Sequence, residues 1–209
     1  MGSEDWYRNK NWTPEIESEF LEKLRRARDK SQYLRIQASY LAKSHPNATL
    51  DLLERFFSLP DNPEQAQAFS DAAIAYLALG QTGEAIASLR KALKRERQPL
   101  SNKTQAGSQF ALLVAEQSLE SHFDEALGVL AEAQSDLFLR SMQFEWHAAY
   151  SLIYAARGER ENAREHATQA LAVAENTRSG LRNHPRAGLV RDEYDDLKTK
   201  LIELSRDGA

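Results

Sequence analysis

Hydrophobic residues in this chain recur every three or four positions, a spacing that places side chains on one face of an α-helix. The first stripe runs through Ile16, Phe20, Leu24 and Ala27. It follows Thr13 and Pro14, where the threonine hydroxyl can accept a hydrogen bond from a free amide and proline suits the first helical position. The pattern predicts a helix that begins directly after Thr13.

Similar stripes predict further helices between clear breaks. We expect helices over 31–43 and 47–57, separated by His45 and Pro46, and a turn over 59–63. An amphipathic helix is expected over 187–204, with its apolar stripe at Val190, Tyr194, Leu197, Leu201 and Leu204. Its other face is charged, as the terminal cap of a repeat array requires. Counted along the whole chain, the pattern predicts about ten helices and an all-α fold.

The segment 66–93 combines two helical stripes with small residues at set positions. Its first stripe holds Phe69, Ala73 and Tyr76, and its second holds Ala85, Ile86, Leu89, Ala92 and Leu93. Gly80 lies between them, where a glycine can adopt positive φ at the end of a helix. The alanines allow the two helices to cross closely, and the larger side chains fill the space between neighbouring pairs.

This pattern recurs twice further along the chain. The alanine that begins each second helix stands at 85, 126 and 163, which gives spacings of 41 and 37 residues. The third copy keeps a glycine at Gly158, whereas in the middle copy we expect Ser121 to replace it. The pair of helices before residue 62 fits a degenerate copy, with Ala48 placed 37 residues before Ala85.

These residues resemble the tetratricopeptide repeat (TPR), a pair of antiparallel helices of about 34 residues. The resemblance implies a TPR-like α-solenoid, a right-handed superhelical stack of antiparallel helix pairs. The expected organisation is an N-terminal segment over 1–12, N-terminal helices over 13–62, three repeats over 63–178, and a loop with a capping helix over 179–209.

Composition narrows the choice of partners. The chain has 209 residues, 42% of them hydrophobic, and a formal net charge of −4, which disfavours nucleic acid because a polyanion needs a basic surface. It has no cysteine, no secretory signal and no apolar run of about 20 residues that could span a membrane. These features predict a cytoplasmic protein without a membrane segment.

No recognised catalytic motif occurs in the sequence, so we expect a non-enzymatic protein without cofactor or metal. The five histidines form no cluster at ligand spacing, and His147 is expected to fill space in the core. Three basic clusters lie around Arg26, Lys94 and Arg182. Each is open to three interpretations: a solvated helix face, a docking surface for an acidic protein, or an RNA-binding site. They contain no interleaved aromatic residues that could stack on unpaired bases.

Repeats of the resembled family bind a peptide or helix along the surface made by the first helix of each pair. Carried to this sequence, the resemblance implies groove residues Tyr33, Gln37, Tyr40, Ser70, Ile74, Leu77, Ala111, Ala115, Ser118, Ala148 and Leu152. Most are small or apolar, which suits an amphipathic helix better than an acidic tail. Trp6, Tyr7 and Trp12 are either a second binding surface or a lid folded over the first helices.

The expected function is therefore an adaptor or inhibitor that binds one protein partner. An immunity protein that neutralises a toxin and an RNA-binding regulator are the alternatives. A monomer or a weak homodimer is expected.

Overall fold

The computed structural model describes residues 6–133, 137, 139–178 and 187–206. Within these ranges the chain forms ten α-helices and no strand, which confirms the all-α prediction. Contacts divide the chain into two compact units, Met1–Ala106 and Gly107–Ala209. The division falls inside the segment predicted to hold three repeats.

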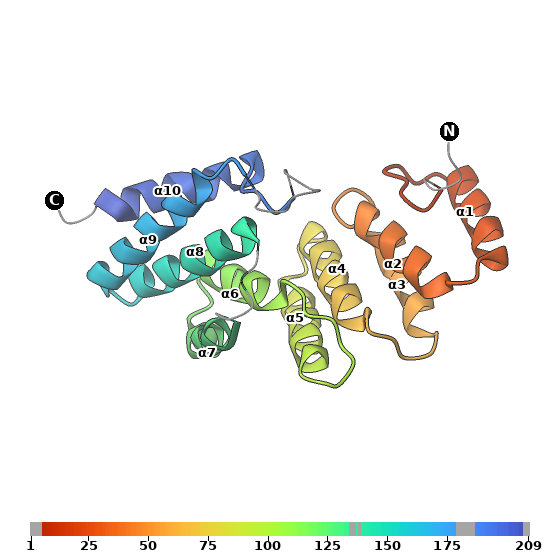
Figure 1. Cartoon of the computed structure of the whole chain (residues 1–209), viewed down its shortest axis with the longest axis horizontal. Coiled ribbons are helices and arrows are strands. Elements are labelled where there is room, and N and C mark those ends of the chain that lie inside the picture. Colours follow the sequence, from red (N-terminus) through yellow and green to blue (C-terminus); the bar gives the residue numbers. More distant parts are fainter. Residues whose placement is uncertain (1–5, 134–136, 138, 179–186, 207–209) are drawn as a thin grey trace. The chain divides into compact units, whose positions relative to one another are not determined.

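The first unit holds five helices arranged in neighbouring pairs (Figure 1). They are α1 (Pro14–Arg26), α2 (Lys30–Leu41), α3 (Pro46–Phe57), α4 (Gln65–Ala78) and α5 (Thr82–Glu96). The predicted cap is confirmed, because the Thr13 hydroxyl accepts a hydrogen bond from the Ile16 amide at 3.4 Å. Asp29 caps α2 in the same way, through the Gln32 amide at 3.1 Å.

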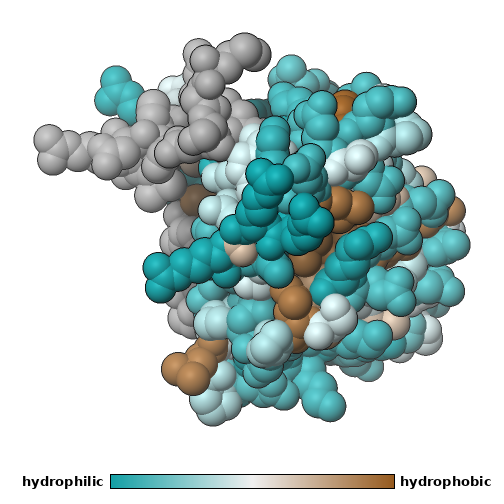
Figure 2. Space-filling model, turned by 90° about the vertical axis from the view of Figure 1, so that its right-hand side faces the viewer, coloured by the Kyte–Doolittle hydropathy of each residue, from teal (hydrophilic) through white to brown (hydrophobic). Residues whose placement is uncertain are grey.

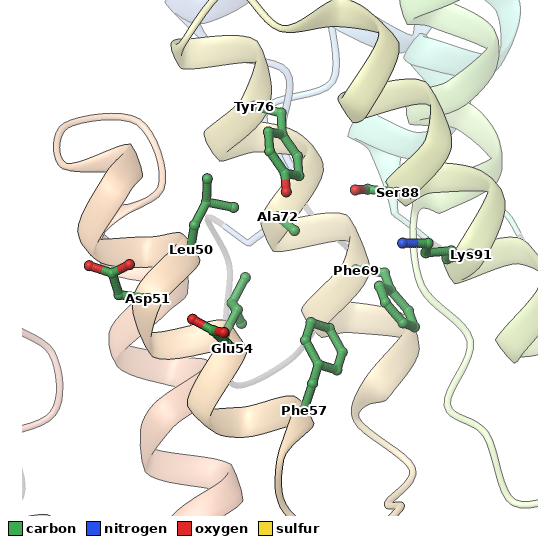
Figure 3. Close-up of a pocket in the computed structure, with 10 residues that line it drawn as sticks. Leu50, Asp51, Glu54, Phe57, Phe69, Ala72, Tyr76, Ser88 and Lys91 are labelled. Carbon is green, nitrogen blue, oxygen red and sulfur yellow. The ribbon is translucent and has the colours of Figure 1, made fainter.

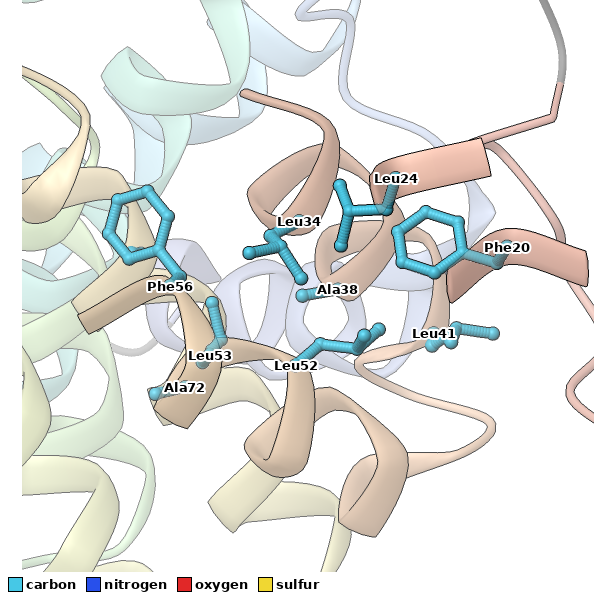
Figure 4. Packing of buried hydrophobic residues seen from close by; sticks show 10 residues of the cluster. Phe20, Leu24, Leu34, Ala38, Leu41, Leu52, Leu53, Phe56 and Ala72 are labelled. Carbon is cyan, nitrogen blue, oxygen red and sulfur yellow. The ribbon is translucent and has the colours of Figure 1, made fainter. Parts of the chain in front are cut away.

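One hydrophobic core joins α1, α2, α3 and α4 (Figure 4). Phe20 from α1, Leu41 from α2 and Phe56 from α3 are each at most 1% exposed. Figure 2 looks onto the side where α1 lies, and it shows a mainly hydrophilic face with a narrow band of hydrophobic residues. The apolar stripes predicted from the sequence therefore point inward in this unit.

A hydroxyl group lies at the crossing of the first helix pair. Thr49 is fully buried, and its side chain donates a hydrogen bond of 3.0 Å to the carbonyl of Ala38 on the facing helix. Ala48, the residue expected at this crossing, is only half-buried. The predicted register was therefore wrong by one residue, because a buried threonine takes the place that alanine has in the later copies.

The second unit contains the remaining five helices. They are α6 (Ala106–Glu116), which starts at the last residue of the first unit, α7 (Phe123–Ala133), α8 (Arg140–Ala156), α9 (Arg160–Ala174) and α10 (Asp195–Arg206). Helices α8 and α9 form a hairpin, and α10 packs mainly against α9. At the hairpin crossing the Ser151 hydroxyl donates to the carbonyl of Ala163 at 2.8 Å.

The C-terminal helix is shorter than predicted. It begins at Asp195 after a 3-10 turn over Asp192–Tyr194, so Val190 and Tyr194 lie outside α10. Arg191 is extended, and Asp195 and Asp196 occupy the first helical turn, where the helix dipole favours carboxylates. Leu197 and Leu201 keep their predicted buried positions. Part of the predicted loop, residues 179–186, lies outside the described residues.

Candidate functional site: the helical repeats

The α4–α5 hairpin has small residues at its crossing and large ones on its flank. Ala73, Ala85 and Ala92 are at most 1% exposed. Their lack of bulk lets the two helix backbones approach closely. Leu89 is buried, whereas Phe69 and Tyr76 are half-buried on the flank of α4 that faces α3. The hairpin thus places each residue type where the sequence pattern predicted it.

Three turns of the same design link the helices of the three copies. Each contains one residue in the left-handed conformation, with φ of +72° at Gly80, +51° at Ser118 and +76° at Gly158. In each turn that residue's amide bonds to the carbonyl three positions earlier, and the next amide bonds to the carbonyl five positions before it. This double hydrogen bond is the Schellman closure of a helix end.

The turn of the middle copy corrects one expectation. Ser118, not Ser121, stands where the other copies have glycine. Helix α6 ends at Glu116, and Ser121 falls in the following 3-10 turn, Glu120–His122. Ser118 was also predicted to line the groove; it is exposed in the turn at the end of α6.

A match to a known protein family covers the α4–α5 helix pair. Residues 66–99 match the tetratricopeptide repeat, and this span begins at the second residue of α4 and continues through the Gly80 turn and α5. This chain carries a tetratricopeptide repeat. No curated protein and no solved structure matches the chain.

The first helix of this TPR carries three of the predicted groove residues. Leu77 is 40% exposed and Ile74 is half-buried, but Ser70 is fully buried. The Ser70 hydroxyl has no hydrogen-bond partner among the described residues. Of these three predicted groove residues, Leu77 and Ile74 are therefore the ones that a partner can reach.

An arginine on α2 that was not predicted to be part of the site links that helix to α4. The Arg35 guanidinium on α2 lies 3.2 Å from the Glu64 carboxylate and 3.6 Å from that of Asp71. Asp71 is 3% exposed, and burial raises its pKa to about 6, although the hydrogen bond from Gln67 and the charge of Arg35 oppose the rise. Arg35 therefore places a positive charge between the first helices of two pairs.

The aromatic N-terminal segment is a lid on the first helices. Trp6 contacts Phe20 and Tyr33, with ring centroids 5.4 and 4.9 Å apart, and Tyr7 also lies against Tyr33 at 4.7 Å. Trp12 packs against Phe20 at 5.5 Å. Of the two alternatives weighed from the sequence, the structure has the lid.

Gln37 holds this lid in place. Its Oε1 accepts hydrogen bonds from the Asn9 backbone amide and from Asn9 Nδ2, both at 3.0 Å, and its Nε2 donates to the Asn9 carbonyl at 2.8 Å. Gln37 is fully buried as a result. Gln37 and Tyr33, both predicted to line the groove, instead contact the chain's own N-terminal segment, whereas Tyr40 is 43% exposed.

The predicted groove residues of the second unit are mostly covered. Ala111, Ala115 and Ala148 are buried, and Leu152 is half-buried. Near the start of α8, Glu145 is 5% exposed and accepts hydrogen bonds from the hydroxyls of Ser108 (2.6 Å) and Tyr194. Burial raises the pKa of Glu145, and the two hydroxyl donors oppose that rise.

Two histidines that are 19 residues apart meet between α8 and α9. Their Nδ1 atoms, on His147 and His166, are 3.1 Å apart, and the Tyr150 ring stacks on His166 at 4.7 Å. Burial lowers the pKa of His147 to about 4, and the neighbouring His166 adds to the shift. Burial also lowers the pKa of His166. His147 does fill space, as expected, but it does so as half of a hydrogen-bonded pair that the sequence analysis missed.

The structure describes only part of the basic clusters that the sequence pointed to. In the second basic cluster, Arg95 is 7% exposed and bonds to Asp61 and to the backbone carbonyls of Asn62 and Pro99. Arg182 and Arg186 of the third cluster lie outside the described residues.

Over the described ranges, no three histidine or acidic side chains gather in a way that could hold a metal ion. None of the described helices is long and apolar enough to cross a membrane.

Proposed function

We propose that the chain is a non-enzymatic interaction module that binds one protein partner, as a helix or peptide, along the first helices of its pairs. The observation that carries the proposal is the exposure of two apolar side chains. Four large hydrophobic residues are exposed among those described, and two of them, Tyr40 and Leu77, are predicted groove residues. An exposed aromatic or aliphatic anchor is what a binding hot spot uses.

The groove we propose is narrower than the sequence suggested. Gln37 and Tyr33 hold the N-terminal lid, so the partner surface of the first unit comprises Tyr40, Ile74 and Leu77. The Arg35 guanidinium, which lies between α2 and α4, is paired with Glu64 and Asp71 of this chain and is not counted in the partner surface. Of the predicted groove residues in the second unit, Leu152 remains part of the proposed partner surface.

An adaptor, an inhibitor and an immunity protein all use such a surface, and the identity of the partner separates them. The RNA alternative has weaker support, because Arg95 of the second basic cluster is committed to internal hydrogen bonds. A cytoplasmic location and a monomeric or weakly dimeric state remain part of the proposal.

The test is affinity capture from a lysate of the native host with wild type and a Leu77→Glu, Leu152→Glu double variant whose helicity is checked. Leu100→Glu is the matched control, because Leu100 is 87% exposed and lies outside the repeats' helices. A protein captured by wild type and control but lost with the double variant supports the proposal. Equal capture by all three rejects this surface, and salt-sensitive capture of RNA supports the alternative.

A further inference from the structure

A groove of about 380 Å³ lies between α3 and the α4–α5 hairpin, within the first unit (Figure 3). Its apolar lining consists of Leu50, Leu53, Phe57, Phe69 and Ala72. None of the predicted groove residues of α4 lines it. The groove is therefore a separate surface from the one proposed above.

Stacked aromatic rings form part of this lining. The rings of Phe57 and Phe69 are 4.5 Å apart and nearly parallel, at 22°. The Phe57 ring also lies against the buried Phe56, at 5.3 Å and 80°. Both stacked rings are half-buried, so each keeps some surface open. Rigid aromatic surface of this kind contributes strongly to binding because little side-chain entropy is lost on contact.

The hairpin side of the groove presents three polar groups that can donate hydrogen bonds. Ser88 is 5% exposed, and its hydroxyl points into the groove (Figure 3). The Tyr76 hydroxyl also points there (Figure 3). The ammonium group of Lys91 lies 5.9 Å from the Phe69 ring centroid and has no ion pair in the described chain. Both hydroxyls and the ammonium group can donate a hydrogen bond to an acceptor on a ligand.

The α3 side carries the opposite charge. Asp51 and Glu54 are exposed, lie one helical turn apart and make no ion pair with described residues. Figure 3 shows them on α3, across the groove from Lys91. Charge is thus separated across the groove, with carboxylates on one wall and an ammonium group with two hydroxyls on the other.

We infer that this groove is a second docking site, for a segment of a partner protein that carries an acidic and a basic residue on either side of a large apolar side chain. The apolar side chain packs on Phe57 and Phe69. The acidic group accepts hydrogen bonds from Ser88 and Lys91, and the basic group pairs with Asp51 or Glu54. The carboxylates on α3 repel a nucleic acid, whose charges are all negative.

The experiment is a selection of random displayed peptides on the purified full-length chain, followed by fluorescence anisotropy with the enriched peptides. Lys91→Glu reverses the charge of one wall, and Ser88→Leu fills the groove. Lys94→Glu is the matched control, because Lys94 is an exposed lysine on the same helix that does not line the groove. Circular dichroism checks that each variant is folded.

We expect wild type to enrich peptides with a large apolar residue beside Asp or Glu. Their affinity should fall at least about tenfold in Lys91→Glu and Ser88→Leu, since each variant removes or reverses a direct contact, and should be unchanged in Lys94→Glu. Selection on Lys91→Glu should favour Lys or Arg at the acidic position.

Two results overturn the inference: no enriched sequence pattern, or enriched peptides that bind Lys91→Glu and Ser88→Leu as tightly as wild type. Peptides that lose affinity only in Leu77→Glu bind the first helices of the pairs. That outcome removes the second docking site and leaves the proposed function standing.

Discussion

Ser118 has the left-handed backbone conformation that Gly80 has in the first repeat, with φ of +51° and +72°. The two residues close identical turns, yet only glycine adopts this conformation without steric cost. The middle copy therefore keeps the turn geometry of the repeat, although it lacks the glycine that marks this turn in the other two copies.

This strain predicts that Ser118→Gly stabilises the chain. The free energy of unfolding should rise by about 0.5–1 kcal/mol, because relief of the left-handed strain exceeds the added entropy of glycine in the unfolded chain. Urea denaturation measures the change. Ser121→Gly is the control and should give no gain; a gain there equal to that of Ser118→Gly would contradict the assignment.

Gln37→Ala should release the N-terminal lid. It removes three hydrogen bonds and leaves polar groups of Asn9 without partners, so the free energy of unfolding should fall by about 2–3 kcal/mol. Gln32→Ala, on the exposed side of the same helix, should change it little. Limited proteolysis gives a second measurement, with faster cleavage before Thr13 expected only in Gln37→Ala. Equal stability of the two variants would show that the hydrogen bonds between Gln37 and Asn9 do not stabilise the lid.

The histidine pair predicts that stability falls in mild acid. The folded-state pKa of His147 is about 4, below its ordinary value of 6.5, so the unfolded chain binds the proton more readily between these pH values. The contribution is fully present above pH 6.5 and is lost as the pH falls toward 4.

His166→Gln should make this pH dependence shallower, and His45→Gln should not. The comparison is between variants because Asp71, whose pKa is raised to about 6, acts in the opposite direction. Its contribution is present below its ordinary pKa of 3.8 and is lost as the pH rises through about 6, and it is common to every variant. Thermal unfolding from pH 4 to 8 provides the measurement. Parallel curves for wild type and His166→Gln would rule out the pair as the cause.

Tyr194→Phe should loosen the C-terminal segment. The substitution keeps the ring against Phe144, at 5.1 Å, but removes the hydroxyl that donates to the buried Glu145 carboxylate. The expected loss is about 1.5–3 kcal/mol, as for hydrogen bonds to charged groups. Tyr150→Phe is the control on α8, because the Tyr150 hydroxyl has no hydrogen-bond partner in the described chain. Hydrogen exchange of α10 should quicken in Tyr194→Phe alone; unchanged exchange would contradict the role of this bond.

Local signals in the sequence were sufficient for the helices and for the crossing of the repeat. Thr13, Gly80 and Ala85 act through their immediate neighbours, and each occupies its predicted place. The start of α10 was predicted too early because an apolar stripe continues through Val190 and Tyr194, although neither residue has α-helical backbone: Tyr194 ends a 3-10 turn. Periodicity alone cannot detect that change of backbone conformation.

The candidate site was harder to predict because its contacts join distant residues. Gln37 and Asn9 are 28 residues apart, and Glu145 and Tyr194 are 49 apart. No spacing rule connects such pairs. A resemblance that assigns residues to a groove by position also cannot foresee that the chain's own N-terminal segment covers two of them.

The Gln37–Asn9 hydrogen bonds also fix the position of the N-terminal segment along α1 and α2. Apolar contacts are not directional, so the rings of Trp6 and Tyr7 alone could slide over the helices beneath them. Hydrogen bonds to the Asn9 backbone amide, carbonyl and side-chain amide hold Asn9 opposite Gln37. The polar contact thus determines where the aromatic side chains sit, and the aromatic side chains supply the buried area.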